Sequence, residues 1–341
     1  MVYEFYSGSY AEPGEDGIVK FCLDVGKRTF EPVFVCRDIK NPSYLAFHAS
    51  RPVLYAVQEE VPTGALHALR IGHDGLEPDC VFSTQGADPC HISVDESGRM
   101  LFVANYTSGS LAVFRLEEGL VTARTQLIVH EGKGTHPTRQ EAPHVHCAKV
   151  RGDEVFVVDL GLDKVFVYGI DEKEGILVDT GKRMCFPPGC GPRHLEFCQS
   201  VPGILYVVCE LSNQIAVFRE QGGEYVLMQL LSTLPADFMG ENTAAAVKTE
   251  RGFLFVSNRG HDSIAAYRIR EDGLLELSQI VPSGGKTPRD FAVFGEHLVV
   301  ANQDSDLITV LRIDWEKGKM EPTELCASTR KPCCILSGKL L

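Results

Sequence analysis

One segment type recurs along this chain. Each copy begins at or near a proline and continues into two short apolar runs that a polar turn separates. The copies begin at Pro42, Pro89, Pro143, Pro192, Asn242 and Pro288. Successive copies start roughly 50 residues apart, a period typical of propeller blades or of helical arrays. No segment keeps a helical apolar period over about 12 residues, so the repeats predict β-blades.

Each repeat has the pattern of four short strands. Runs rich in β-branched and aromatic residues are bounded by Gly, Pro, Asn and Asp, which is typical of strands. The chain starts on a second-strand pattern at 3–6 and ends on a first-strand pattern at 331–336. One blade built from both ends would remove exposed sheet edges. We therefore predict an all-β, seven-bladed β-propeller of four-stranded antiparallel blades, forming one domain over residues 1–341.

Charge and segment patterns limit the partners. The chain has 33 Lys and Arg against 46 Asp and Glu, a net charge of −13. An acidic protein of this kind is a poor partner for nucleic acid or an anionic membrane. No apolar run approaches the roughly 18 residues of a membrane span, and the first residues lack the pattern of a signal peptide. We expect a cytoplasmic protein, a monomer or weak homo-oligomer, with no nucleic-acid or membrane partner.

Twelve cysteines are present, but their spacing predicts neither a disulfide framework nor a zinc site. Cys185 with Cys190, and the adjacent Cys333 and Cys334, lack a second CxxC or CxxH. Cys147 lies in an apolar strand pattern, where cysteine behaves as a small hydrophobe. We expect reduced, buried thiols, and neither a metal nor a cofactor.

Equivalent positions of the blades can be compared, because the start of a first strand and the end of a second strand lie at the same edge. The position after the second apolar run is mostly small and polar, which fits turn chemistry: Ser7, Gln58, Asn105, Asp159, Cys209, Asn258 and Asn302. The next position varies in chemistry: Gly8, Glu59, Tyr106, Leu160, Glu210, Arg259 and Gln303. A structural role would favour similar residues, so we predict functional roles for Glu210 and Arg259.

The starts of the first strands carry cations. They include His144, His146, Arg193, His194 and Arg289, and Arg139 lies in a loop leading to the same edge. In an acidic protein such a group forms a local positive field that attracts an anion. A histidine is suited to acid–base work near neutral pH, and arginines bind carboxylate or phosphate and stabilise an oxyanion. We expect this edge to face solvent. The motifs G-x-S-x-G, Walker A and H-E-x-x-H are absent from the sequence.

The runs PHVHC, DLGLDKV, GPRHLEF, SNRGHDSI, TPRDF and VANQDSD occur in this order over nearly the whole chain. With them the chain resembles the lactonase family of seven-bladed propellers, which includes 6-phosphogluconolactonases and carboxy-cis,cis-muconate cyclases. The resemblance implies a metal-independent enzyme that hydrolyses or forms a lactone. It also implies a catalytic histidine at His146, a substrate-binding arginine at Arg193, an acidic partner at Glu210 and a further arginine at Arg259. The fifth repeat start, NTAAAV, departs from the pattern because it lacks both the proline and a charge.

These observations together predict hydrolysis of a small anionic sugar-acid lactone, in the manner of a 6-phosphogluconolactonase. His146, aided by Glu210, is expected to activate water, while Arg193 and Arg259 hold the anion and stabilise the tetrahedral oxyanion. Either His146 or Glu210 is the base, and the anion is a phosphate or a carboxylate. The further substrate-binding residues are expected to be His144, His194, Arg289, Arg139, Gln303 and Tyr106.

Three alternatives stand beside this prediction. The first is a cycloisomerase of the muconate cyclase type, in which His146 or Glu210 transfers a proton to or from carbon. The second is a non-catalytic interaction propeller, although one Trp and no repeated Trp-Asp pair argue against the WD type. The third is a calcium-dependent lactonase with oxygen ligands from Asp159, Asn105 and Asn302, which the neighbouring cations would disfavour.

Overall fold

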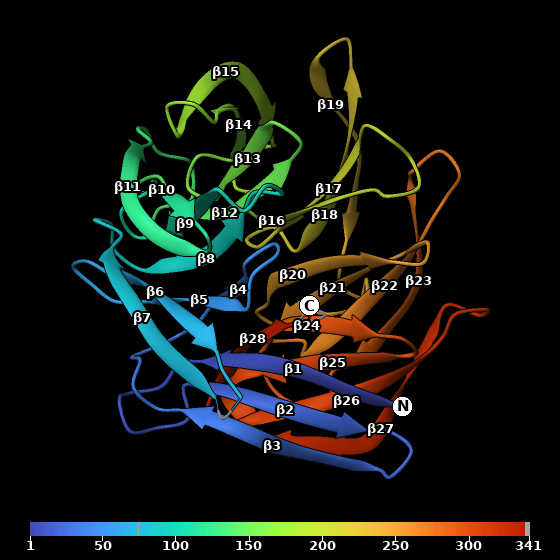
Figure 1. Ribbon diagram of the computed structural model, residues 1–341. Helices are drawn as coiled ribbons and strands as arrows, with labels where there is room; N and C mark the ends of the chain where they lie inside the picture. Colours follow the sequence, from blue (N-terminus) through green and yellow to red (C-terminus); the bar gives the residue numbers. More distant parts are fainter. Residues whose placement is uncertain (74, 338–341) are drawn as a thin grey trace. The chain divides into compact units, whose positions relative to one another are not determined.

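The computed structural model describes residues 1–73 and 75–337. The chain divides into two compact units, which we describe separately. Among the described residues, unit 1 comprises 1–7, 20–33 and 190–337, and unit 2 comprises 8–19 and 34–189. Strands β1 to β28 and one short 3₁₀ helix make up the regular structure of the described residues (Figure 1). No helix among these residues is long and apolar enough to cross a membrane.

Unit 2 contains three complete four-stranded antiparallel sheets whose strands follow one another in chain order. The first consists of β4 (Leu45–Phe47), β5 (Val53–Gln58), β6 (Ala65–Ile71) and β7 (Leu76–Ser83). The second consists of β8 (Pro89–Val94), β9 (Met100–Asn105), β10 (Ser110–Glu117) and β11 (Leu120–Val129). The third consists of β12 (Val145–Arg151), β13 (Glu154–Asp159), β14 (Lys164–Asp171) and β15 (Ile176–Cys185).

Unit 1 contains three more complete sheets of the same design. The first consists of β16 (Pro192–Phe197), β17 (Ile204–Cys209), β18 (Gln214–Gln221) and β19 (Glu224–Ser232). The second consists of β20 (Thr243–Glu250), β21 (Phe253–Arg259), β22 (Ser263–Ile269) and β23 (Leu275–Pro282). The third consists of β24 (Pro288–Phe294), β25 (His297–Asn302), β26 (Leu307–Asp314) and β27 (Lys319–Ser328), with η1 (Gln303–Ser305) after β25.

The seventh sheet joins the two ends of the chain. Its order is β28 (Pro332–Leu336), β1 (Val2–Ser9), β2 (Ile18–Asp24) and β3 (Thr29–Cys36), so the last strand pairs with the first. In Figure 1 the red β28 lies beside the blue β1. The carboxylate of Asp290 also accepts a hydrogen bond from the N–H of Ile335, at 2.9 Å. The predicted all-β class, the seven four-stranded sheets and the shared terminal sheet are confirmed, whereas the single-domain prediction stays a prediction.

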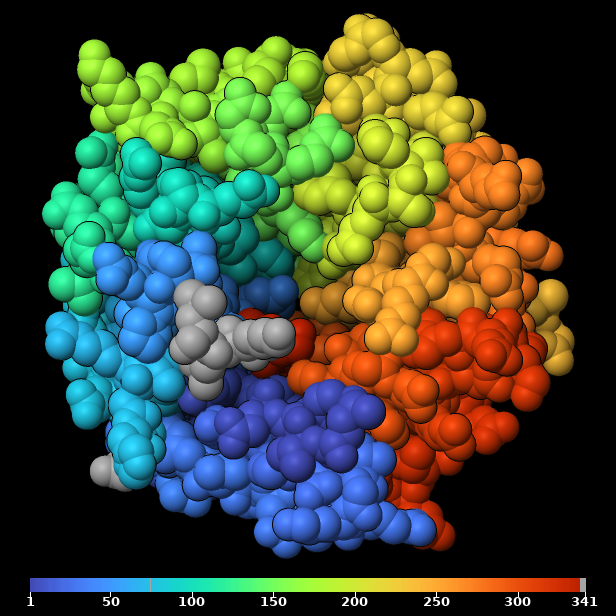
Figure 2. Space-filling view, turned by 45° about the vertical axis from the view of Figure 1, so that its right-hand side comes forward, coloured from blue at the N-terminus to red at the C-terminus, as the bar shows by residue number. Residues whose placement is uncertain are grey.

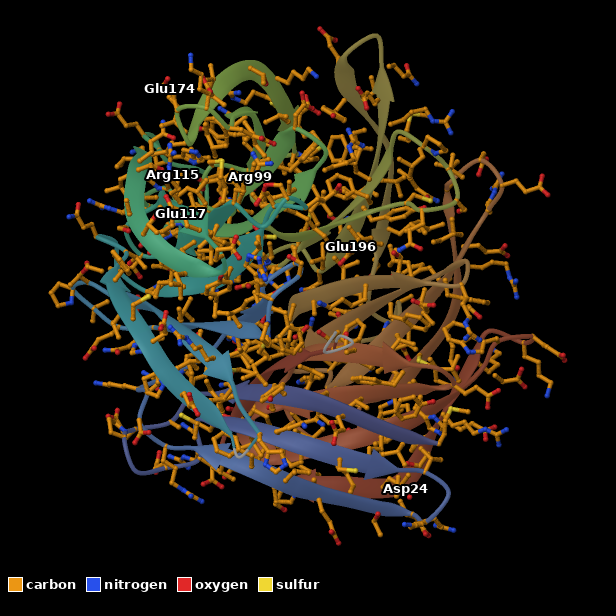
Figure 3. All side chains as sticks on the ribbon, viewed as in Figure 1. Asp24, Arg99, Arg115, Glu117, Glu174 and Glu196 are labelled. Carbon is orange, nitrogen blue, oxygen red and sulfur yellow. The ribbon has the colours of Figure 1, made fainter. Side chains whose placement is uncertain are left out.

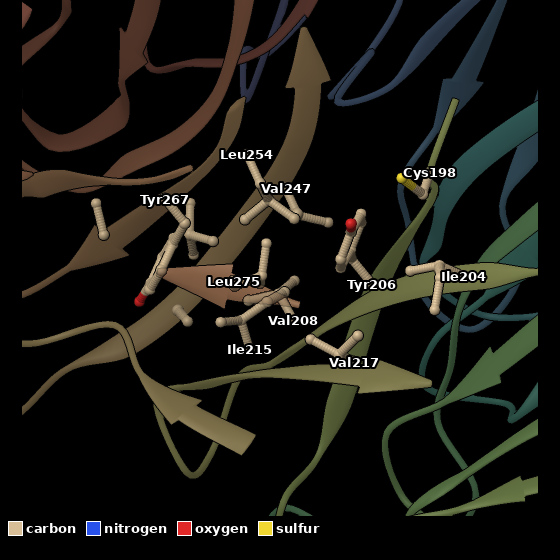
Figure 4. Packing of buried hydrophobic residues seen from close by; sticks show 13 residues of the cluster. Cys198, Ile204, Tyr206, Val208, Ile215, Val217, Val247, Leu254, Tyr267 and Leu275 are labelled. Carbon is tan, nitrogen blue, oxygen red and sulfur yellow. The ribbon is translucent and has the colours of Figure 1, made fainter. Parts of the chain in front are cut away.

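The core of each unit lies between neighbouring sheets. In unit 1, β17, β18, β21 and β22 contribute one cluster of buried side chains, among them Val208, Ile215 and Leu254 (Figure 4). Tyr206 and Tyr267 are fully buried in it, and their hydroxyls donate to the carbonyls of Gly273 and Ser232. A buried tyrosine needs such a partner. Full burial of a large apolar side chain stabilises the fold by about 1.5–3 kcal/mol.

Exposed charged side chains contact residues of the neighbouring sheet. In unit 2, Nη2 of Arg115 on β10 donates to the carbonyl of Glu174 at 2.7 Å (Figure 3). Nη1 of Arg99 lies 3.2 Å from Glu172. These contacts join neighbouring sheets, but exposed ion pairs contribute at most about 1 kcal/mol each. The space-filling view shows residues 190–337 of unit 1 in yellow-green to red, and their surface atoms are closely packed (Figure 2). The apolar cores therefore dominate stability.

Candidate active site

β-Bulges lie near the starts of the first strands. In β8, β12, β16 and β24 the pairing with the second strand shifts by one residue, and the extra residues are Cys90, His146, Arg193 and Arg289. A bulge re-aims a side chain and is over-represented beside active sites. Three of the four bulge residues are ones that the sequence analysis predicted as functional. The fold thus gives His146, Arg193 and Arg289 the same local backbone irregularity.

In unit 1, two arginines share one carboxylate oxygen. Nε of Arg193 on β16 lies 3.0 Å from Oε2 of Glu210, and Nη2 of Arg259 at the end of β21 lies 2.9 Å from the same atom. Glu210 follows β17, where its N–H donates to the carbonyl of Gly191 at 2.7 Å. The side chains of Arg193 and Glu210 are 3% and 4% exposed. Two largely buried guanidiniums therefore lie beside one buried carboxylate.

The start of β20 explains how both arginines are held. Nη1 of Arg193 donates to the carbonyl of Ala245 at 2.8 Å, and Nη2 of Arg259 donates to the carbonyl of Ala244 at 3.3 Å. The NTAAAV segment lacks charged side chains, but its backbone carbonyls bind the guanidiniums. The NTAAAV segment, which differs from the other repeat starts, therefore helps to hold the two arginines in place. Nη1 of Arg193 also lies 3.2 Å from Nε2 of His194, so this predicted residue joins the same cluster.

The pKa of Arg259 reflects both its burial and its charged neighbours. Burial lowers the pKa of Arg259 to about 10, the carboxylate of Glu210 opposes this effect, and the charges of Arg193 and Arg289 lower the pKa further. At neutral pH the guanidinium remains charged. The influence of Arg289 shows that it lies within electrostatic reach of the cluster. Gln303 begins η1 and its side-chain amide donates to Asp304 at 3.0 Å, so this hydrogen bond does not join Gln303 to the arginines.

In unit 2, Tyr106 connects three predicted residues. Its ring stacks on the ring of His144, with centroids 4.4 Å apart and an interplanar angle of 13°. The same ring meets His146 edge to face at 5.6 Å and 77°. Its hydroxyl accepts a hydrogen bond from Nη2 of Arg139 at 3.1 Å. Three other residues that the sequence singled out, His144, His146 and Arg139, therefore come together around the phenol of Tyr106.

The hydrogen bonds of the two histidines differ. Nδ1 of His144 lies 3.1 Å from the carbonyl of Tyr106, and since a carbonyl only accepts, Nδ1 is the donor. That Nε2 lies 3.6 Å from Oε1 of Glu141. Nδ1 of His146 instead lies 3.9 Å from Sγ of Cys90. The sequence analysis missed Cys90, although its place beside His91 at the start of β8 matches that of Arg193 beside His194.

The expectation of a solvent-facing edge is wrong. His146, Arg193 and Glu210 are 5%, 2% and 3% exposed. In unit 1 the backbone of residues 244–245 binds the arginines, and in unit 2 the ring of Tyr106 packs against both histidines. Charges in such surroundings interact more strongly with a ligand than they would in water. Their removal also carries a cost in stability that an exposed site would not show.

Among residues 1–73 and 75–337 there is no group of three or more His, Cys, Asp or Glu that could hold a metal ion. None of the twelve cysteines forms a disulfide. Eight of them are buried, but Cys185 and Cys326 are exposed. This departs from the expectation of buried thiols, because both lie on the outermost strands, β15 and β27, where alternate side chains point outward.

Residues 4–337 match the protein family described as "Lactonase, 7-bladed beta-propeller". The chain belongs to this family. The match covers nearly the whole chain, so the seven sheets are the blades of a seven-bladed β-propeller, as predicted. The predicted enzyme class, a lactonase, is confirmed with it.

Individual lactonases are similar over their full lengths. The chain is 33% identical to the 6-phosphogluconolactonase of Bacillus subtilis (strain 168), over 98% of this chain and 97% of the relative. The solved structure of the periplasmic gluconolactonase of Pseudomonas aeruginosa is 30% identical in sequence, with a TM-score of 0.92 and 98% of each chain covered. A crystal structure of a Lactobacillus plantarum protein is also 30% identical, with a TM-score of 0.92, covering 99% of this chain and 100% of that one.

Proposed function

We propose that this lactonase hydrolyses the lactone of a phosphorylated sugar acid, with 6-phosphogluconolactone as the first candidate. The observation that carries the proposal is the pair of guanidiniums, Arg193 and Arg259, on one carboxylate oxygen of Glu210. Arg289 lies within electrostatic reach of the same cluster. Guanidiniums donate charge-assisted, often paired hydrogen bonds to a phosphate or carboxylate, so this group of arginines favours an anionic ligand. The similarity to the Bacillus subtilis enzyme supports the choice of substrate.

The two candidate bases are in different surroundings. The carboxylate of Glu210 is stabilised in its charged form by two guanidiniums, which makes it a weak proton acceptor. The imidazole of His146 meets the ring of Tyr106 edge to face, and an imidazole is suited to proton transfer near neutral pH. We therefore assign the general base to His146, and to Glu210 the positioning of the two arginines.

The proposed reaction balances without a cofactor. Water attacks the lactone carbonyl carbon and gives a proton to His146. The attack forms a tetrahedral oxyanion, which arginines stabilise. The ring C–O bond then breaks, and the leaving ring oxygen takes the proton back from His146. The product is the open-chain sugar acid. His144, His194, Arg139, Arg289, Tyr106 and Gln303 are proposed to contact the substrate.

Product analysis tests this function against its alternatives. The purified enzyme is incubated with 6-phosphogluconolactone, unphosphorylated gluconolactone and a muconate, each with and without excess chelator. We expect hydrolysis of both lactones, the highest kcat/KM for the phosphorylated one, and no effect of chelator. Turnover of the muconate alone would favour the cycloisomerase. No turnover of any compound would favour an interaction propeller.

The calcium-dependent alternative requires Asp159 as a ligand. Both of its carboxylate oxygens are engaged, Oδ1 by the N–H groups of His144 and Leu162 and Oδ2 by His130. This occupancy weighs against calcium, and we propose a metal-independent reaction. Loss of activity in the chelator arm of the experiment would contradict that proposal.

We also propose that the enzyme works in the cytoplasm as a monomer or weak homo-oligomer. Twelve cysteines with no disulfide fit a reducing compartment. Cell fractionation should place the activity in the cytosol, and size-exclusion chromatography should give the mass of one chain. Activity released with the periplasm, or the mass of a stable dimer, would contradict these proposals.

A further inference from the structure

His130 stands out among the residues that follow the fourth strands. The residue after a fourth strand donates its N–H to a carbonyl before the third strand at 2.9–3.1 Å. It is small and carries a hydroxyl in four blades, at Thr84, Thr233, Ser283 and Thr329, but it is His130 after β11 and Phe186 after β15. The end of the second strand carries asparagine in three blades, at Asn105, Asn258 and Asn302, but β13 ends on Asp159.

In unit 1 a pair of neutral side chains makes a connection of this kind between neighbouring sheets. In unit 1, Oγ1 of Thr233 donates to Oδ1 of Asn258 at 2.7 Å, which joins the end of β19 to the end of β21. His130 and Asp159 make the matching connection in unit 2, with Nδ1 and Oδ2 2.6 Å apart. Their side chains are 3% and 0% exposed. Burying an ionisable pair costs more than burying a neutral one, so holding the blade together does not account for the His–Asp pair.

The pair is linked to the predicted catalytic histidine. Oδ1 of Asp159 accepts the N–H of His144 at 2.9 Å, and Val145 faces Asp159 in the β12–β13 register, just before the bulge at His146 (Figure 1). The ring of His144 stacks on Tyr106, whose ring meets His146 edge to face. A continuous series of contacts therefore runs from the buried carboxylate to the imidazole of His146.

We propose that Asp159 and His130 are positioning residues for His146, holding the start of β12 and, through His144 and Tyr106, the angle of the His146 ring. This inference rests on the proposed function, because it assumes that His146 is the base. Burial raises the pKa of Tyr168 to about 12, so its hydroxyl keeps its proton. That hydroxyl lies 3.1 Å from Nε2 of His130 and fixes the other side of the ring.

Three substitutions test the proposal by kinetics. Asp159→Asn should fold, because three other blades carry asparagine at this position, but it removes the carboxylate that pairs with His130. His130→Leu removes the donor to Asp159, whereas His130→Asn places an amide nitrogen near the position of Nδ1. We expect kcat to fall about 10- to 100-fold in Asp159→Asn and His130→Leu, since small misplacements of catalytic groups are costly. KM should stay within about twofold, and His130→Asn should recover most of the lost kcat.

Thr309→Val is the matched control. It removes the hydroxyl that accepts Nδ2 of Asn302 at 2.9 Å and donates to the carbonyl of Ser283, a neutral connection between the ends of β23 and β25 in unit 1. We expect a lower Tm and an unchanged kcat. Parent-like kcat in both Asp159→Asn and His130→Leu would overturn the proposal. So would an equal loss of kcat in Thr309→Val, because the effect would then follow stability alone.

A spectroscopic readout separates this proposal from the proposed function. Imidazole NMR signals of His144 and His146 are assigned with His144→Gln and His146→Gln. They should shift in His130→Leu and return toward their parent positions in His130→Asn. If the parent hydrolyses no lactone, the proposed function fails while this measurement still decides the positioning. Unchanged ring signals in His130→Leu would overturn the inference even if the parent is active.

Discussion

Nη2 of Arg259 lies 2.9 Å from Oε2 of Glu210, and Nε of Arg193 approaches the same oxygen at 3.0 Å. One carboxylate thus holds two buried guanidiniums that point to the binding of an anion. The cluster comes from three places in unit 1: the start of β16, the position after β17 and the end of β21. Its stability and its proposed chemistry depend on the same three side chains.

Replacing Glu210 by Gln keeps the shape of the side chain but removes its charge. Two guanidiniums then remain buried without a counter-charge, so the free energy of unfolding should fall by about 3–5 kcal/mol. Urea denaturation measures the change, and inorganic phosphate should restore part of it by binding the folded state. Glu224→Gln, at the exposed start of β19, is the control and should change stability by at most about 0.5 kcal/mol. Equal stability of the two variants would contradict the role of Glu210.

His146→Ala should lower kcat by about 10²–10⁴ with a smaller change in KM, because it removes the proposed general base. Steady-state kinetics on 6-phosphogluconolactone measures both constants. His297→Gln, a buried histidine of β25 outside the cluster, is the control and should keep the parent kcat. A parent-like kcat in His146→Ala would remove this residue from the mechanism.

His67 predicts a pH dependence of stability. Burial lowers its pKa to about 4, and its Nε2 lies 3.0 Å from Oε1 of Gln58. In the unfolded chain the pKa is about 6.5, so between these values the unfolded state binds more protons and stability falls as the pH falls. The loss between pH 7 and pH 4 amounts to up to about 3 kcal/mol. Urea denaturation at several pH values should show a smaller loss in His67→Gln, and identical losses would contradict the assignment.

Deletion from Pro332 onward removes β28 from the terminal sheet. Strand β1 then loses its partner and presents an open edge, and the buried side chains of residues 333–335 are lost from the core. We expect a lower Tm and self-association, measured by calorimetry and by size-exclusion chromatography. A monomeric protein with the parent Tm would contradict the role of β28. A single cooperative transition of the parent would support the proposal of one domain.

The fold could be predicted because every blade must bury the same alternating faces, so its pattern recurs in the sequence. The repeat starts from Pro42 to Pro288 are visible signals of that requirement. The sharing of the terminal sheet followed from the same pattern, because the incomplete repeats at 3–6 and 331–336 complement each other.

The details of the site were harder to predict from the sequence than the fold. Comparison of equivalent positions identified Glu210 and Arg259, but their direct contact depends on three-dimensional packing. The sequence could not show that uncharged Ala244 and Ala245 bind arginines, because they do so through backbone carbonyls. His130 was missed since its partner, Asp159, lies 29 residues away and belongs to the next blade.

The central claim is that Arg193 and Arg259 bind and stabilise the anion of a lactone substrate. It is tested most directly by kcat/KM for 6-phosphogluconolactone in Arg193→Ala and Arg259→Ala, beside the parent enzyme. Circular dichroism must first show that both variants are folded. The account predicts that kcat/KM falls about 10²–10³-fold in each, as expected for loss of one oxyanion donor. Values within about threefold of the parent in both variants would contradict it.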